Sequence, residues 1–132
     1  MARYNHEGYN DPTAYEALLN VEKRKPLVFI CSPYAGDVEF NVTRAKQYGR
    51  FTISQRVIPI IPHLMYPQFL RDDKPAERKL GLEMGLVLLT KCSELWVFGD
   101  RVSKGMEVEI RKAKQRNMII RYFTVEGEEE TS

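Results

Sequence analysis

The sequence contains only two cysteines, Cys31 and Cys92, and both lie within apolar runs. Two cysteines are too few for a four-cysteine zinc site or for a disulfide framework. No apolar run approaches the roughly 18 residues of a membrane-spanning helix, and the polar start MARYNHEGYN is unlike a secretion signal. These absences predict reduced core thiols, no metal, no cofactor, no membrane partner and a cytoplasmic protein.

Neither sign of charge dominates, because 20 basic and 18 acidic residues give a formal net charge of +2. Without a strong basic stripe, a nucleic-acid polymer is disfavoured as the main partner, whereas a small phosphorylated ligand remains compatible. The 132 residues, of which 43% are hydrophobic and 29% charged, suffice for one globular domain with a proper core.

Apolar runs and helical patterns alternate after residue 26. Four runs read as strands, at 27–32, 56–63, 94–99 and 118–123, and three segments read as helices, at 38–52, 76–92 and 103–116. LVFICS lacks polar alternation, which is typical of a strand buried on both faces of a parallel sheet. The pattern predicts an α/β fold: a three-layer sandwich around a mainly parallel, flavodoxin/Rossmann-like sheet of four to five strands.

Two segments flank this domain, which is predicted to span residues 26–123. Residues 1–25 form an N-terminal extension whose later part, DPTAYEALLNVEKRK, has a short helical pattern. Residues 124–132 form an acidic tail that we expect to be disordered.

The helical segment 76–92 is apolar on two sides. Leu80, Met84, Val87 and Leu88 share one face, and Leu82, Leu86 and Leu89 share another. A helix of this kind is usually covered on both faces, so we expect a contact between subunits and a homo-oligomer.

Three loops follow strands at their carboxyl ends, where parallel α/β sheets bind ligands: 32–41, 62–75 and 99–106. The first begins Ser32-Pro33-Tyr34-Ala35-Gly36-Asp37 and leads into a helix. Backbone N–H groups at such a helix start favour anions, and glycine lets a ligand approach the backbone. An ordinary tight turn is the alternative, and Asn41 can be a ligand contact or a helix-start hydrogen bonder.

The third loop leads into a helix whose face contains a carboxylate. In FGDRVSKGMEVEIRKAKQ, Ser103 is a plausible N-cap and Gly105 lies in the first turn. A stripe facing the protein is shared by Val102, Met106, Glu109, Ile110 and Ala113, while Glu107 and Arg111 form an exposed i,i+4 pair. A carboxylate on that stripe must be desolvated, hydrogen-bonded or facing a pocket. Alternatively, Glu109 tilts to solvent or pairs with Lys112.

The motifs FICSPYAG, IPHLMY, CSELWVFG and SKGMEVEIRKA resemble those of the nucleoside 2-deoxyribosyltransferase-like proteins, which include 2′-deoxynucleoside 5′-monophosphate N-hydrolases. The resemblance spans about residues 27–122, and S-x-G-x-x-x-E-[IL]-x-x-A is its most specific part. It implies that residues 26–123 are a deoxyribosyltransferase-like domain with Glu109 as catalytic nucleophile. It also implies that Ser103 contacts phosphate, that loop 32–37 meets sugar or phosphate, and that a neighbouring subunit completes the site. The predicted substrate-binding residues are Ser32, Pro33, Tyr34, Gly36, Asp37, Asn41, His63, Tyr66, Ser103, Gly105 and Met106.

One expected group has no clear counterpart. The family usually protonates the departing base with an aspartate, but GLEMGLVLLTKC carries only Glu83, and Glu94 opens the third strand. His63, Asp72 and Asp73 are the substitutes. Tyr34 and Tyr66 can stack a base or simply pack, whereas Trp96 is expected in the core.

Two functions remain open for a nucleoside or nucleotide ligand. The first is cleavage of its N-glycosidic bond, by a deoxyribosyltransferase or a deoxynucleoside monophosphate N-hydrolase. The alternative is a non-catalytic module that binds or sequesters a nucleotide or an ADP-ribose-like ligand.

Overall fold

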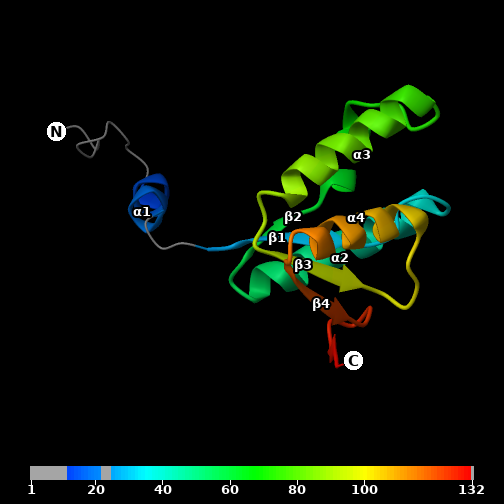
Figure 1. Cartoon of the computed structure of the whole chain (residues 1–132). Helices are drawn as coiled ribbons and strands as arrows, with labels where there is room; N and C mark the ends of the chain where they lie inside the picture. Colours follow the sequence, from blue (N-terminus) through cyan, green and yellow to red (C-terminus); the bar gives the residue numbers. More distant parts are fainter. Residues whose placement is uncertain (1–11, 22–24, 132) are drawn as a thin grey trace.

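The computed structural model describes residues 12–21 and 25–131 of the chain. Its elements, in chain order, are α1 (Pro12–Asn20), β1 (Leu27–Cys31), α2 (Val38–Ser54), β2 (Ile58–Ile60), the 3-10 turns η1 (Pro62–Leu64) and η2 (Tyr66–Gln68), α3 (Pro75–Leu89), β3 (Glu94–Phe98), α4 (Lys104–Gln115), β4 (Ile119–Phe123) and β5 (Glu129–Glu130). Strands and helices alternate from β1 to β4, as the sequence pattern predicts (Figure 1).

The five strands form one sheet in the order β2-β1-β3-β4-β5. The first four are parallel, and β5 is antiparallel to β4. The middle strands β1 and β3 are the most buried, because helices cover both of their faces. The predicted α/β fold with a mainly parallel sheet is therefore confirmed.

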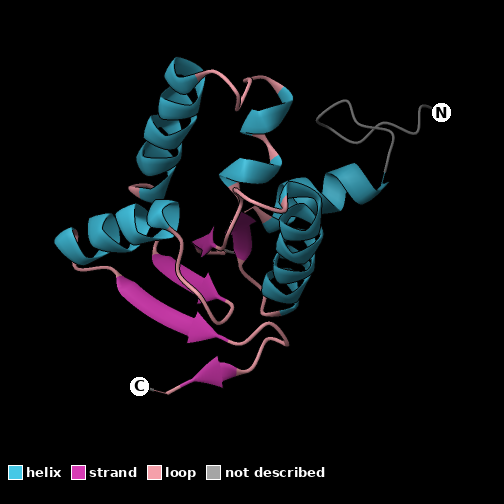
Figure 2. Cartoon of the chain, turned by 90° about the vertical axis from the view of Figure 1, so that its right-hand side faces the viewer, coloured by secondary structure: helices cyan, strands magenta, loops and turns pink. Residues whose placement is uncertain are grey.

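Two apolar cores lie on opposite faces of the sheet, because neighbouring residues of a strand point to opposite sides. On one face, Phe29, Cys31 and Leu95 pack with Leu89 of α3 and Met106 of α4. The other face buries Val28, Ile30, Tyr48, Trp96, Phe98 and Phe123 against α2. This gives three layers, with α2 alone on one side (Figure 2). Trp96, only 2% exposed, lies in the core as predicted.

Several elements differ in length from their predicted ranges. The N-terminal helix ends at Asn20, and none of its residues is buried. The second strand shrinks to three residues at the sheet edge, where Pro59 costs no ladder hydrogen bond that a neighbour needs, and Pro62 lies in η1. In α3, Gly85 and Leu89 are buried, whereas Leu80, Leu82 and Val87 are exposed on the single chain.

The prediction of a fully disordered acidic tail is wrong for the part that the structure describes. Glu129 and Glu130 form β5, which pairs with Phe123 and Tyr122. Composition favoured disorder, but Arg121 supplies the opposite charge: its guanidinium donates to both carboxylate oxygens of Glu129, at 2.8 and 2.6 Å. Ser132 lies outside the described residues, as does the polar start at 1–11.

Candidate active site

The loop after β1 folds back on itself at the carboxyl edge of the sheet. Gly36 has φ +98°, in the left-handed region that favours glycine, and Asp37 caps α2 by accepting a hydrogen bond from the Phe40 N–H at 3.2 Å. Asn41 is 4% exposed, and its Nδ2 donates to the carbonyls of Tyr34 at 3.0 Å and Ala35 at 3.1 Å. Asn41 therefore holds the shape of the loop, and it also lines the cavity described below.

The second loop meets the first through His63. Its Nε2 lies 3.3 Å from Oγ of the buried Ser32, and its ring stacks on Tyr34 with centroids 5.4 Å apart. Burial lowers the pKa of His63 to about 4, so the imidazole is neutral at pH 7. A neutral imidazole can hydrogen-bond a ligand, but it is a poor proton donor to a departing base.

The third loop ends at the N-terminus of α4, where Ser103 is the N-cap, as predicted. Its Oγ accepts a hydrogen bond from the Met106 N–H at 3.3 Å. A Cβ added at Gly105 would meet nothing within 4 Å, so the first turn of α4 is open to an approaching ligand. Met106 was predicted to contact substrate, but it is only 1% exposed. It packs in the core beneath α4 and offers no surface to a substrate.

Glu109 lies on the inward face of α4 and is half-buried. Burial raises the pKa of its carboxyl from 4.5 to about 7, and a hydrogen bond with Cys31 acts in the opposite direction. Burial and the nearby Glu109 carboxylate also raise the pKa of the Cys31 thiol well above its ordinary value. Glu109 forms no ion pair with any described residue, so the alternative of pairing with Lys112 is not supported.

Cys31 is the site residue that sequence reasoning missed. It was assigned to the core, and it is indeed fully buried, with its Sγ 3.9 Å from the Met106 carbonyl of α4, and its thiol and the Glu109 carboxyl each affect the pKa of the other. The only sequence signal for this contact is position, because Cys31 ends β1 immediately before Ser32.

The candidate proton donors are spread widely. Glu94 opens β3 at the opposite edge of the sheet from the three loops, where it accepts from Trp96 Nε1 at 2.8 Å and lies 3.8 Å from Arg121. Asp73 pairs with Arg71 at 3.0 Å. Burial raises the pKa of the Tyr34 phenol, and the negative charge of Asp72 raises it further. Asp72 is thus the candidate with a direct link to the first loop.

Tyr66 and Glu83 complete the set of predicted residues. Tyr66 is half-buried in η2 and forms no ring contact with the residues that the structure describes. Glu83 is exposed on α3. Pro33 instead lines a cavity of about 250 Å³ on the α2 side, which is described below. Across residues 12–21 and 25–131, no three His, Cys, Asp or Glu side chains group to hold a metal ion, and no helix is long and apolar enough to span a membrane.

Comparison with known proteins supports the fold. A solved structure described as a 2-desoxiribosyltransferase from Leishmania mexicana superposes with a TM-score of 0.54 at 12% sequence identity, over 75% of this chain. The match spans 64% of that structure, less than two thirds of its length. At this identity the likeness shows a shared fold, which is the part of the predicted resemblance that it bears out. No curated protein matches the sequence. A family model described as Domain of unknown function (DUF7768) matches residues 26–123, and the chain belongs to that family.

Proposed function

We propose that this chain binds a nucleoside or nucleotide at the carboxyl edge of its sheet and cleaves the N-glycosidic bond with Glu109 as nucleophile. The observation that carries the proposal is the half-buried Glu109 carboxyl, which forms no ion pair with a described residue and whose pKa burial raises to about 7. Such perturbed carboxyls in a ligand-binding edge are candidates for catalysis. The likeness in fold to a 2-desoxiribosyltransferase supports the same reaction class.

The reaction has two steps. A carboxylate oxygen of Glu109 forms a bond to the anomeric carbon while the bond from that carbon to the base nitrogen breaks, and the base leaves with the electron pair. The base gains a proton from an acid or from water. Water, or a second base, then attacks the anomeric carbon and releases the Glu109 carboxylate, with loss of a proton to solvent.

The chain offers a specific residue for each supporting task. The open turn at Gly105 and the Ser103 cap would receive a phosphate at the N-terminus of α4, where N–H groups and the helix dipole favour anions. Ser32, Tyr34 and the neutral His63 would contact the sugar or base. Asp72, through its proximity to Tyr34, is the candidate for protonating the base.

A binding module is the second candidate, and one observation favours it. None of the candidate acids interacts directly with Glu109, and Glu94 lies at the far edge of the sheet. A site without an acid would hold a nucleotide or an ADP-ribose-like ligand and release no base.

We further propose that the chain forms a homo-oligomer through the exposed apolar face of α3. Leu80, Leu82 and Val87 are 44%, 38% and 58% exposed on one α-helix. Leu80 and Val87 share one face of this helix and Leu82 lies on another, and exposed apolar residues on two faces of a helix favour an interface. An adjoining subunit there would border the second loop, which precedes α3.

The decisive experiment compares Glu109→Gln with Glu107→Gln. Purified protein is incubated with a panel of nucleosides and nucleotides, and free base is measured by chromatography. Glu109→Gln should lower cleavage by about a thousandfold or more with little change in ligand affinity, because the carboxylate acts mainly in the transition state.

Glu107 is the matched control, because it is an exposed glutamate on the same helix. Glu107→Gln should keep parental activity. Equal activity of the two variants would exclude Glu109 as the nucleophile. Binding without any release of base by the parent protein would favour the binding module.

A further inference from the structure

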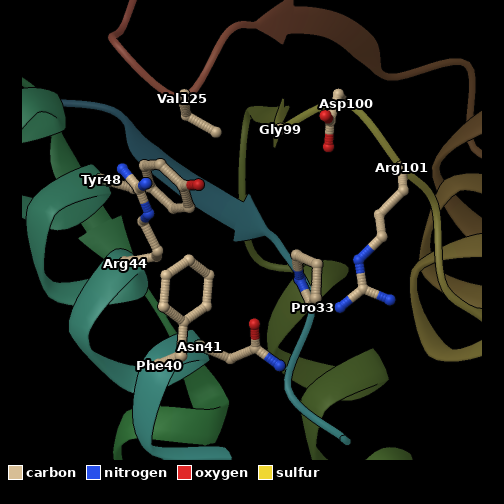
Figure 3. A pocket seen from close by; sticks show the side chains of 9 residues that line it. All are labelled: Pro33, Phe40, Asn41, Arg44, Tyr48, Gly99, Asp100, Arg101 and Val125. Atoms are coloured by element: carbon tan, nitrogen blue, oxygen red, sulfur yellow. The ribbon is translucent and has the colours of Figure 1, made fainter. Parts of the chain in front are cut away.

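A cavity of about 250 Å³ opens at the carboxyl edge of the sheet on the side covered by α2. Arg44 and Tyr48 reach it from α2, and Asp100 and Arg101 from the loop after β3. Figure 3 shows Arg44 beside the Phe40 and Tyr48 rings on one side of the cavity and Arg101 on the other. The cavity volume lies slightly below the ~300–1,000 Å³ of typical small-molecule sites.

This cavity is separate from the Glu109 region. Tyr48 stacks on Phe98 at 4.5 Å and belongs to the core on the α2 face. Glu109 interacts with Cys31, which belongs to the core under α3 and α4. The two places thus adjoin opposite faces of the sheet, and Glu109 is not among the residues that line the cavity.

Two arginines and one aspartate line the cavity, so its lining carries a net positive charge. Neither Arg44 nor Arg101 forms an ion pair with a described residue. Asp100 and Arg101 are both exposed, so water weakens the repulsion of an anion by the one and its attraction by the other. Two guanidinium groups in a concave site favour a phosphate, which arginine binds through paired N–H donors.

Tyr48 supplies a hydrogen-bond donor to the cavity. The residue is 4% exposed, its hydroxyl makes no hydrogen bond with another described residue, and Figure 3 shows the oxygen pointing into the cavity. Burial raises the pKa of Tyr48, with Arg44 opposing and Asp100 and Glu126 adding to the effect, so the hydroxyl stays protonated. No described side chain has a buried oxygen or nitrogen without a partner, so the Tyr48 hydroxyl reaches solvent through the cavity and is free to donate to a ligand there.

Phe40 supplies an apolar surface. Its side chain is 52% exposed, although aromatic rings are usually buried, and the Arg44 guanidinium carbon lies 5.1 Å from the ring centroid. The ring and the guanidinium together can flank a planar group.

We propose that this cavity is a second ligand site, which binds a phosphate monoester of a compound with a planar ring. Arg101 pairs with the phosphate, the Tyr48 hydroxyl donates to a phosphate oxygen, and the planar ring packs on Phe40, beside the positive charge of Arg44. The site is independent of the chemistry proposed for Glu109.

Two-dimensional amide NMR of the full chain tests the proposal, with phenyl phosphate as the probe. Titration should shift the amide signals of Gly99, Asp100 and Arg101 to saturation. Inorganic phosphate and phenol, which each supply one half of the probe, should bind at least tenfold more weakly. Equal affinity for phenyl phosphate and inorganic phosphate would overturn the role of the ring.

Variants assign the contacts. Arg101→Ala and Tyr48→Phe should each weaken binding about tenfold, while Asp100→Asn should tighten it severalfold because it removes the opposing charge. Two control variants should bind the probe as the parent does. Arg50→Ala removes an exposed arginine of α2 that does not line the cavity, and Glu109→Gln changes a residue of α4 that does not line it either. Loss of binding in Arg50→Ala equal to that in Arg101→Ala, or no gain in Asp100→Asn, would overturn the site.

Discussion

At the scale of single residues, we expect the environment of Glu109 to affect both stability and the proposed cleavage. A carboxyl whose pKa is about 7 in the folded chain is half ionised at neutral pH. A nucleophile must be ionised, so cleavage by the parent protein should increase as pH rises toward 8. Folding has the opposite dependence, because ionisation places a charge where water is largely excluded.

The sign of the stability effect follows from the raised pKa. The folded pKa of Glu109 lies above the ordinary value of 4.5, so the protonated carboxyl favours folding below about pH 4.5, and this contribution is lost as pH rises through about 7. Glu109→Gln replaces the carboxyl with an amide that does not ionise. The free energy of unfolding of the variant minus that of the parent should therefore increase between pH 5 and pH 8, by at most about 3 kcal/mol.

Urea unfolding at pH 5 and pH 8 measures this difference. All other titrating groups, including His63, are common to both proteins and cancel. Glu107→Gln, on the exposed side of α4, should show no such pH-dependent gain. A constant difference between Glu109→Gln and the parent at both pH values would show that Glu109 is solvated like an ordinary carboxylate.

At the scale of elements, substitutions at two helical glycines can distinguish an effect on helix stability from an effect on ligand binding. Gly105 in α4 has open space at its Cβ position, and Gly81 in α3 would make an ordinary contact with Leu70 at 3.5 Å. Alanine at either position should stabilise its helix or leave it unchanged, by up to about 1 kcal/mol. Only Gly105→Ala should impair ligand binding, because its methyl group would occupy the space above the first turn of α4.

Thermal unfolding and ligand titration of the two variants check this expectation. Gly81→Ala is the control, since it changes a helical glycine far along α3 from the proposed site. If Gly105→Ala bound nucleotides as tightly as Gly81→Ala, the first turn of α4 would not be a phosphate contact.

The sequence predicted these elements well where local patterns determine them. The apolar run of β1, the Ser103 cap and the inward face of α4 follow from residue type and spacing alone. Composition predicted disorder at Glu129, but its pairing with Arg121 depends on a contact between two strands. The same holds for Cys31 beside Glu109 and for the cavity at Tyr48, which arise only when distant segments meet.

At the scale of the whole molecule, the two faces of the sheet are covered unequally. The α2 face carries an aromatic core in which Phe98 and Phe123 stack at 5.0 Å. On the other face, α3 packs through Gly85 and Leu89 and leaves Leu80, Leu82 and Val87 to solvent. Phe69, which is 73% exposed, precedes α3 in the same segment. This imbalance is the physical basis for expecting a second subunit on the α3 side.

A charge at Val87, in the last turn of α3, tests the expected oligomer. Val87→Glu should convert the oligomer into a folded monomer, because in a two-fold interface the new carboxylate would be buried close to its own copy. Val87 is 58% exposed in the single chain, so the variant should keep its secondary structure and cooperative unfolding. Light scattering coupled to size-exclusion chromatography gives the mass, and circular dichroism checks the fold.

Ile53→Glu is the matched control. Ile53 is a 62% exposed apolar residue on α2, on the other side of the sheet, so its variant should retain the parental mass. A monomeric parent at micromolar concentration, or an unchanged mass for Val87→Glu, would show that the α3 face is not the contact.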